Sequence, residues 1–167
     1  MSVRTWLQDH PAPLVFAWRI TEAVTKPMKP IFERVGIERS SWLMNPVEIT
    51  IKHLLFNCQE CGQCVLHFTG MTCPMTCPKQ IRNGPCGGVR LNGKCEVYPE
   101  RDCVWVKGIG RINKTPWGRE IYRLNPPVDW RLEGLSTWVT MPTGLDQVTT
   151  GSEQTARYGD EVLEVKK

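Results

Sequence analysis

The chain has 167 residues and a formal net charge of +4. This length suits one domain with arms, and it is too short for a (β/α)8 barrel, which typically needs about 250 residues. The mild positive charge gives little support for nucleic-acid binding, because no basic helix or ribbon of basic and aromatic residues stands out. No apolar run approaches the ~20 residues of a membrane span, and the N-terminus lacks a signal-peptide pattern. We therefore expect a cytoplasmic protein without nucleic-acid or membrane partners.

Two helices are predicted before the first cysteine. The first covers residues 14–24, and Pro27 and Pro30 break the helical pattern after it. Its apolar side chains recur every fourth residue: Phe16, Ile20 and Val24. The second helix is predicted to start at Asn45 as the N-cap, with Pro46 at N1 and Glu48 at N3 as in a capping box, and to end near Phe56. Its expected apolar face consists of Val47, Ile51, Leu54 and Leu55.

Eight cysteines follow, and none occurs elsewhere in the chain. They are Cys58, Cys61, Cys64, Cys73, Cys77, Cys86, Cys95 and Cys103. Disulfides are rare in a reducing compartment, and small disulfide scaffolds usually spread their bridges through the whole chain. Residues 58–107 are rich in Gly and Pro and lack periodicity, so bound metal is the expected organiser of this section. All eight cysteines are therefore candidate metal or cluster ligands.

The spacing Cys58-x2-Cys61-x2-Cys64 places three thiols on one tight loop, and these are the surest candidates. Three sulfurs from one loop and a fourth from a remote cysteine can hold a [4Fe–4S] cluster, and a proline often follows that fourth ligand. Cys73 and Cys77 both precede a proline. Zinc usually takes paired Cys-x2-Cys knuckles, so it fits this spacing less well but remains the alternative. Eight cysteines allow two four-sulfur sites, or one site with spare thiols.

The later cysteines lie in less regular surroundings. Cys86 sits in NGPCGG (residues 83–88), whose glycines would let backbone N–H groups approach a cluster. Cys95 and Cys103 are candidate ligands of a second site, or small buried apolar residues. A β-hairpin is predicted over residues 87–98 with a turn at Asn92-Gly93. Four cations are expected around the site, or else on ordinary solvated surface: Lys79, Arg82, Arg90 and Lys94.

Residues 108–167 carry few core signals, and paired prolines make residues 122–130 read as extended chain. Four irregularly spaced tryptophans would anchor this arm to the protein's own surface or to a partner: Trp105, Trp117, Trp130 and Trp138. The tail from Thr149 is polar and expected to be frayed. The resulting division is an N-terminal helical arm (1–44), a cysteine-rich domain (45–107) and an extended C-terminal arm for partner contact (108–167). The predicted fold class is a small α+β protein with a core organised by metal or cluster, N-terminal helices and one short hairpin.

Histidines add little to the ligand set. His67 lies three residues beyond Cys64 and could ligate zinc, although a hydrogen-bonding neighbour is the more common role. The sequence contains no nucleophile with a base at recognisable spacing, no phosphate-binding glycine loop and no paired carboxylates among the cysteines. We therefore expect a non-catalytic subunit that carries electrons or a partner interface.

The cysteine section and the segment NPPVDWRLEGLSTW resemble the methylenetetrahydrofolate reductase C-terminal family over residues 45–146. The most specific segments are NGPCGG and CEVYPERDCVW (residues 95–105). The resemblance implies a small cysteine-rich subunit that accompanies, or is fused to, a flavin-bearing (β/α)8 reductase of one-carbon (folate) metabolism. It implies one or two [4Fe–4S] clusters, or zinc, on cysteines matching the eight above, in a hetero-oligomer with the flavin in the partner. The function expected from it is electron transfer; the alternative is a structural zinc subunit that docks or stabilises the flavoprotein.

Overall fold

The computed structural model describes residues 3–84, 86–122 and 124–147, and the regular structure in these ranges is helical. The α-helices are α1 (Val3–Asp9), α2 (Ala12–Thr25), α3 (Lys29–Val35), α4 (Ile37–Phe56), α5 (Val104–Ile112) and α6 (Thr137–Thr143). Short 3-10 helices are η1 (Lys26–Met28), η2 (Leu66–Thr69), η3 (Pro74–Thr76), η4 (Glu120–Tyr122), η5 (Trp130–Leu132) and η6 (Leu145–Gln147). No helix in the described part of the chain is both long enough and apolar enough to cross a membrane.

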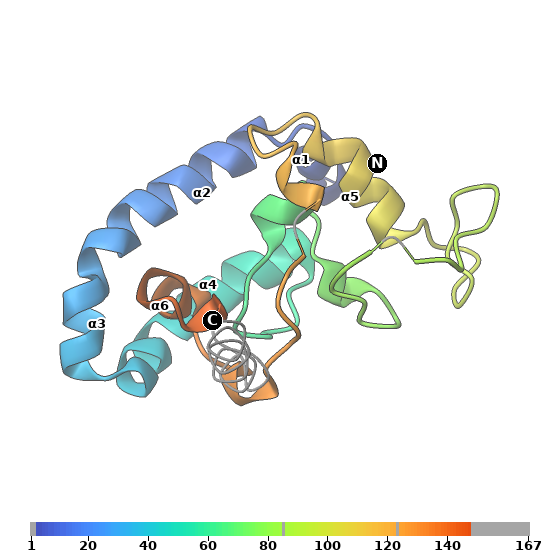
Figure 1. Ribbon diagram of the computed structural model, residues 1–167. Coiled ribbons are helices and arrows are strands. Elements are labelled where there is room, and N and C mark those ends of the chain that lie inside the picture. Colours follow the sequence, from blue (N-terminus) through green and yellow to red (C-terminus); the bar gives the residue numbers. More distant parts are fainter. Residues whose placement is uncertain (1–2, 85, 123, 148–167) are drawn as a thin grey trace, which may run out of the picture.

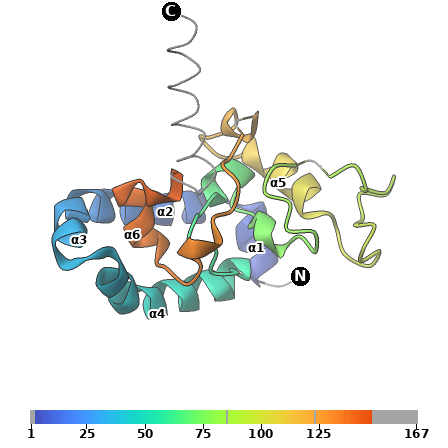
Figure 2. The same cartoon turned by 60° about the horizontal axis from the view of Figure 1, so that its bottom comes forward.

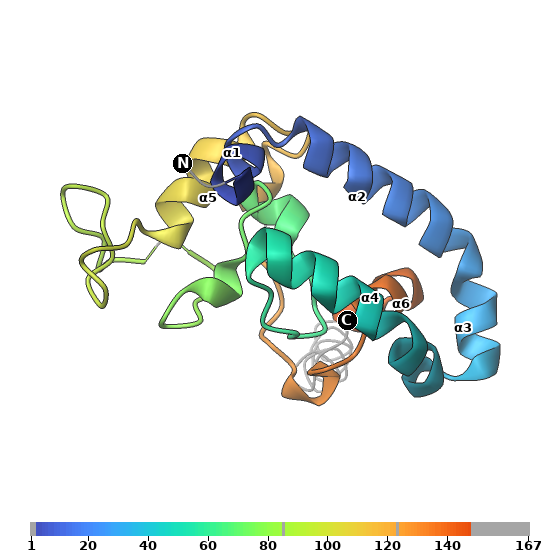
Figure 3. The ribbon, with the colours of Figure 1, turned by 180° about the vertical axis from the view of Figure 1, so that it is seen from behind.

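The helices α2, η1 and α3 form a curved arm along one side of the molecule, and α4 returns beneath it (Figure 1). Helix α6 lies in the bend and contacts α2, α3 and α4. Figure 2 shows α6 alongside both α4 and the arm. Helix α5 and the long loop before it lie at the opposite end, where the loop projects away from the body (Figure 3). The central part of the molecule, between these two ends, contains the turns of residues 57–77.

Helix α2 confirms the first predicted helix, but the prolines after it do not stop helical structure. Pro27 and Pro30 lie in the first turns of η1 and α3. The missing N–H of proline is not needed in a first turn, so the arm bends and continues. The repeating side chains of Phe16, Ile20 and Val24 are 67%, 48% and 55% exposed, so this apolar stripe faces outward.

The predicted start and buried face of the second helix are wrong. Helix α4 begins at Ile37 after Gly36 and runs through Pro46 to Phe56, so Asn45 is not its N-cap. Its buried side chains are Ser40, Ser41, Glu48, Lys52 and Phe56. Three of the four residues expected to be buried are instead 45–73% exposed: Val47, Ile51 and Leu54. The helix is turned so that the polar pair Glu48 and Lys52 faces inward.

The predicted α+β fold is wrong as well, because the described residues contain no β-strand and therefore no hairpin. Gly93 and Lys94 close a tight turn with Arg90, but the returning chain pairs with the segment before α5. That pairing is one isolated antiparallel bridge between Lys94 and Asp102. Leu91 is fully exposed, so no apolar face exists on which a longer hairpin could pack.

A core organised by the cysteines is not what the structure shows. The buried hydrophobic cluster combines Leu14 and Val15 of α2, Phe56 of α4, Leu66 of η2, and Met71. Cys64 and Cys73 are only partly buried and pack against its side. The described helices therefore close around aliphatic and aromatic side chains, and Cys64 and Cys73 lie at the edge of that cluster.

The C-terminal tryptophans take different positions. Trp105 is buried and donates a hydrogen bond from its indole nitrogen to the Ile81 carbonyl at 3.0 Å. Trp117 packs against the hydrophobic cluster, whereas Trp130 is 51% exposed. The predicted frayed tail from Thr149 lies outside the described residues. Partner contact by the C-terminal arm stays a prediction.

Candidate metal centres

The structure separates the eight cysteines into two sets of four. One small cavity, called here the first site, is lined by Cys58, Cys61, Cys64 and Cys73. A different cavity, the second site, is lined by Cys77, Cys86, Cys95 and Cys103. The sets divide at η3, since Cys73 directly precedes this turn and Cys77 directly follows it. Four residues of chain span at most about 14 Å, so the two sites are close neighbours.

The loop of the first site is tightly wound. The backbone is left-handed at Asn57, Glu60 and Gly62, with φ of 54°, 51° and 68°. Glycine is required at the third position on two grounds. A Cβ on Gly62 would fall 2.0 Å from the carbonyl oxygen of Leu132, and the positive φ disfavours any L side chain. The loop backbone therefore packs directly on the chain entering α6.

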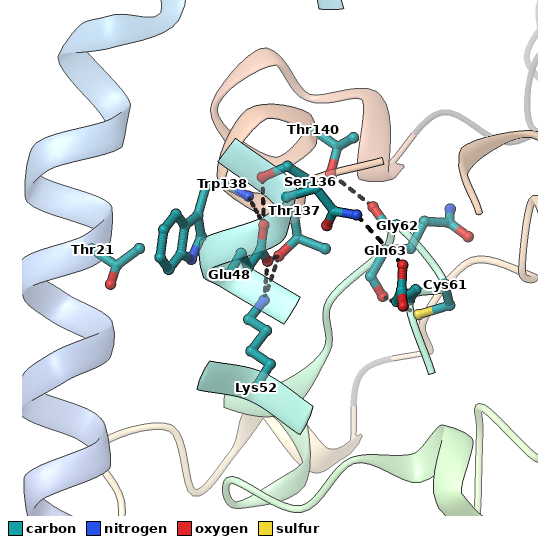
Figure 4. Close-up of polar contacts among 12 residues, drawn as sticks. Thr21, Glu48, Lys52, Cys61, Gly62, Gln63, Ser136, Thr137, Trp138 and Thr140 are labelled. Carbon is teal, nitrogen blue, oxygen red and sulfur yellow. Dashed lines mark hydrogen bonds and ion pairs between the residues drawn. The ribbon is translucent and has the colours of Figure 1, made fainter. Parts of the chain in front are cut away.

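The C-terminal segment also holds this loop by hydrogen bonds. Gln63 is fully buried, and its amide nitrogen donates to the carbonyl of Asp146 at 3.0 Å. Its amide oxygen accepts from the backbone N–H of Asp129 at 2.7 Å. The Thr140 hydroxyl donates to the Gly62 carbonyl at 2.7 Å (Figure 4). Residues 129–146 thus fix the three-cysteine loop in place, a contact that the sequence pattern did not reveal.

A repeated backbone contact reaches the sulfurs. Cys58, Cys64 and Cys73 each accept a hydrogen bond from the backbone N–H two residues ahead. In the second site the N–H of Gly88 lies 3.4 Å from the sulfur of Cys86. N–H donors stabilise thiolate over thiol, and they are among the contacts that tune thiolate-bound metal centres. Four of the eight sulfurs therefore have surroundings suited to metal-binding thiolates.

Three thiols of the first site resist ionisation: those of Cys58, Cys64 and Cys73. Burial raises the pKa of Cys58 to about 11, and the neighbouring Cys64 thiolate adds to this rise. Burial, and next the thiolate of Cys64, also raise the pKa of Cys73. Metal binding requires deprotonated thiols, and a bound cation removes this mutual repulsion. A shared metal centre would therefore stabilise the thiolate forms of these three cysteines.

Two buried cations lie beside the first site. Arg82, one of four cations expected there, is 6% exposed and donates to the Gln63 carbonyl at 2.9 Å. The second cation is Lys52, whose burial the sequence pattern does not predict. Its ammonium group lies 2.6 Å from the carboxylate of Glu48, and both side chains line the cavity of the first site. Figure 4 shows this pair between α4 and the first turn of α6. The only signal in the sequence was the i,i+4 spacing of an acid and a base, which usually marks an exposed helix surface.

The second site has more open surroundings. Lys79 pairs with Glu96, and Lys94 pairs with Asp102 at 2.7 Å. Their side chains are 35–47% exposed, so solvent screens these pairs. Gly88 packs against Glu96, because a Cβ there would fall 1.9 Å from the carboxyl carbon. The carboxylate is the end of a flexible side chain and can move aside, so this contact does not by itself require a glycine.

His67 does not join the cysteines in either lining. Its ring lies 3.9 Å from that of Phe68 and 5.1 Å from that of Trp18, between centroids, which places it in an aromatic cluster. In the part of the chain that the structure describes, no three His, Cys, Asp or Glu side chains are arranged to hold a metal ion. What the structure provides is the donor chemistry: two groups of four thiols, which suit zinc or an iron–sulfur cluster.

The comparisons with known proteins agree with the resemblance noted from the sequence. A family model described as methylene-tetrahydrofolate reductase C terminal matches residues 38–131. The match includes all eight cysteines and the whole of α5, and it starts near the beginning of α4. The comparisons with curated proteins and with solved structures gave no match. The family model spans more than half of the chain, so the chain belongs to the methylene-tetrahydrofolate reductase C-terminal family.

Proposed function

We propose that this chain is the iron–sulfur subunit of a methylenetetrahydrofolate reductase-like flavoprotein complex, and that it passes electrons to or from the partner's flavin. The observation that carries the proposal is the grouping of eight cysteines into two four-thiol sites joined by η3. A thiolate-bound cluster would supply one-electron transfer. The chain's own residues would hold the ligands, exclude water from the first site and keep the two sites adjacent.

The ligand pattern supports iron over zinc at the first site. Three of its cysteines come from one loop, and the fourth, Cys73, is remote and precedes Pro74. This is the arrangement in which bacterial ferredoxins bind [4Fe–4S] clusters. Zinc knuckles usually contribute ligands in two separate pairs. A structural zinc subunit remains the second candidate, and it predicts a colourless protein that unfolds when a chelator removes the metal.

Exposed apolar side chains support a protein partner. On α4, Leu43, Val47 and Leu54 are 71%, 57% and 73% exposed. The arm adds a second outward stripe that includes Phe16 at 67% exposure. Apolar surface arranged along helices usually marks a contact with another protein. The partner proposed here is the (β/α)8 flavoprotein, which the family description suggests and which this chain is too short to contain.

The test is to purify the protein without oxygen, alone and co-expressed with a reductase flavoprotein, and to measure iron, zinc, acid-labile sulfide and visible absorption. Equal amounts of iron and sulfide, with absorption that bleaches on reduction, and co-purification of a flavoprotein are the expected results. Zinc without iron would refute electron transfer and favour the structural role. A metal-loaded protein that never associates with the flavoprotein would refute the proposed partner.

A further inference from the structure

A buried ion pair lies against the first site without contributing a ligand to it. The side chains of Glu48 and Lys52 are 3% and 8% exposed, and their charged atoms lie 2.6 Å apart. Both line the same cavity as Cys58, Cys61, Cys64 and Cys73. A buried ion pair rarely stabilises a fold, because its desolvation penalty can exceed the attraction between the charges. Its position beside four thiols points to a role for the charge itself.

The carboxylate of Glu48 has hydrogen-bond donors besides Lys52. Its carboxylate accepts hydrogen bonds from the hydroxyls of Ser136 and Thr137, and from the backbone N–H of Trp138 at 3.2 Å. These donors belong to the N-cap and first turn of α6 (Figure 4). Helix α6 therefore holds the carboxylate of Glu48 in a fixed position beside Lys52.

Lys52 also has a fixed position. Its ammonium group donates to the Glu48 carboxylate and to the Thr137 hydroxyl, so α4 and α6 hold it from two sides. Four thiolates around a zinc ion or a [4Fe–4S] cluster leave a net negative charge, and the low dielectric of a buried site strengthens the effect of any nearby cation. The second site has no comparable arrangement, since its lysines are partly exposed and paired with carboxylates.

We propose that Lys52 is a fixed counter-charge of the first metal centre, positioned by Glu48 and α6, and that it makes this centre easier to reduce. This inference rests on the proposed function for the presence of metal, but the counter-charge role applies to a cluster or to zinc.

The electrostatics of the thiols agree with this geometry. Burial works to lower the pKa of Lys52, but the thiolate of Cys64 and the carboxylate of Glu48 outweigh it and raise the pKa. Burial raises the pKa of Cys64. The positive charge of Lys52 works to lower this pKa and the negative charge of Glu48 works to raise it, and the effect of Lys52 is the larger of the two. At Cys64 the attraction of the ammonium group of Lys52 therefore outweighs the repulsion of the carboxylate of Glu48.

The test compares variants of the full chain, loaded with metal under the same conditions. Glu48→Gln/Lys52→Met removes the buried cation without stranding a buried carboxylate. Lys107→Met is the matched control, because it removes a lysine that pairs with Asp102 at 3.0 Å on the side of the second site. Glu48→Gln alone keeps the cation and removes its partner, so it must change the first site in the opposite direction.

With iron bound, the readout is an anaerobic redox titration followed by electron paramagnetic resonance, in which Cys73→Ala and Cys77→Ala identify the signal of each site. We expect the first-site potential to fall in the double variant, to rise in Glu48→Gln and to stay unchanged in Lys107→Met. With zinc bound, the readout is competition with a chelator. The double variant should then bind zinc about tenfold more weakly at the first site, a typical effect for residues that support metal ligands.

The outcomes separate the two proposals. Zinc instead of iron in the wild type would refute electron transfer and leave the counter-charge role to be decided by the chelator. Equal first-site properties in wild type, Glu48→Gln and the double variant would overturn the role of Lys52 while leaving the iron–sulfur assignment intact. If the double variant does not fold, Glu48→Gln decides the question. An unchanged or lower first-site potential in that variant, or unchanged or weaker zinc binding, would then overturn the role of Lys52. Wild-type protein that binds no metal would overturn both proposals.

Discussion

Replacing Gly62 with alanine should damage the first site more than a left-handed backbone alone explains. An L residue in this conformation costs about 1–2 kcal/mol. The new Cβ would also lie 2.0 Å from the carbonyl oxygen and 2.7 Å from the carbonyl carbon of Leu132. Both atoms belong to the backbone, so the loop must move, and overpacking of this kind costs about 1–3 kcal/mol. The total expected loss of stability is about 2–5 kcal/mol.

Gly144→Ala is the matched control for this change. Gly144 has a φ of 82°, and no atom lies within 4 Å of the position of its Cβ. It should therefore lose only the conformational part, about 1–2 kcal/mol. In a chain of this length, 1 kcal/mol shifts Tm by roughly 2–4 °C, so Gly62→Ala should melt roughly 2–12 °C below the control.

The assay is thermal unfolding of both metal-loaded variants, followed by circular dichroism, with metal content measured in the same samples. Gly62→Ala should also lose metal from the first site, because Cys61 and Cys64 flank the displaced backbone. Equal melting temperatures and equal metal content in the two variants would refute the packing of this loop on Leu132.

Three further changes test other contacts. The pKa of Glu48 is lowered because Lys52 and hydroxyl donors outweigh burial. The stability that this carboxylate contributes is therefore present above the ordinary carboxyl pKa of 4.5 and is lost as pH falls through the lower folded value. Glu48→Gln should remove this part of the acid dependence of Tm, and an unchanged profile would contradict the pairing. Two lysine ammonium groups hold the pKa of Asp102 at about 2, so its contribution to stability is present above pH 3.8 and is lost toward pH 2. Asp102→Asn should flatten the acid side of the stability profile by less than about 1 kcal/mol, because the carboxylate is exposed. Arg111 is buried and its guanidinium lies 2.7 Å from the carboxylate of Asp9, so Arg111→Met should lower the free energy of unfolding in urea by about 1.5–3 kcal/mol; no change would show that this contact does not hold α1.

The first helix could be predicted from the sequence because it depends on local spacing; the metal ligands, which rest on local spacing too, stay a prediction. Three cysteines at two-residue intervals must lie on one loop, and apolar residues at four-residue intervals must share a helix face. The division of the eight cysteines could not be predicted. Cys73 and Cys77 are four residues apart, each precedes a proline, and only the path of η3 places them in different sites.

The second helix shows how a local pattern can mislead. Asn45, Pro46 and Glu48 match a capping box, in which Glu48 would bond to the start of its own helix. In the structure the carboxylate of Glu48 instead accepts hydrogen bonds from the start of α6, almost ninety residues later in the chain. A contact of that range leaves no periodic signal, so the burial of Glu48 and Lys52 was missed.

The hairpin prediction failed for a related reason. Asn92-Gly93 does form a tight turn, with Gly93 donating to the carbonyl of Arg90 at 2.8 Å. A turn becomes a hairpin only when its strands have a surface to cover. Here Leu91 is exposed, and Lys94, after the turn, forms an isolated antiparallel bridge with Asp102 instead.

The most direct test of the two-site arrangement is the metal and sulfide content of Cys73→Ala and Cys77→Ala, purified without oxygen beside the wild type. The structure predicts that each variant loses about half of the metal and that the two lose different halves, recognised by different spectra. Loss of the same metal from both variants, or full retention in either one, would show that Cys73 and Cys77 do not belong to separate centres and would contradict the arrangement proposed here.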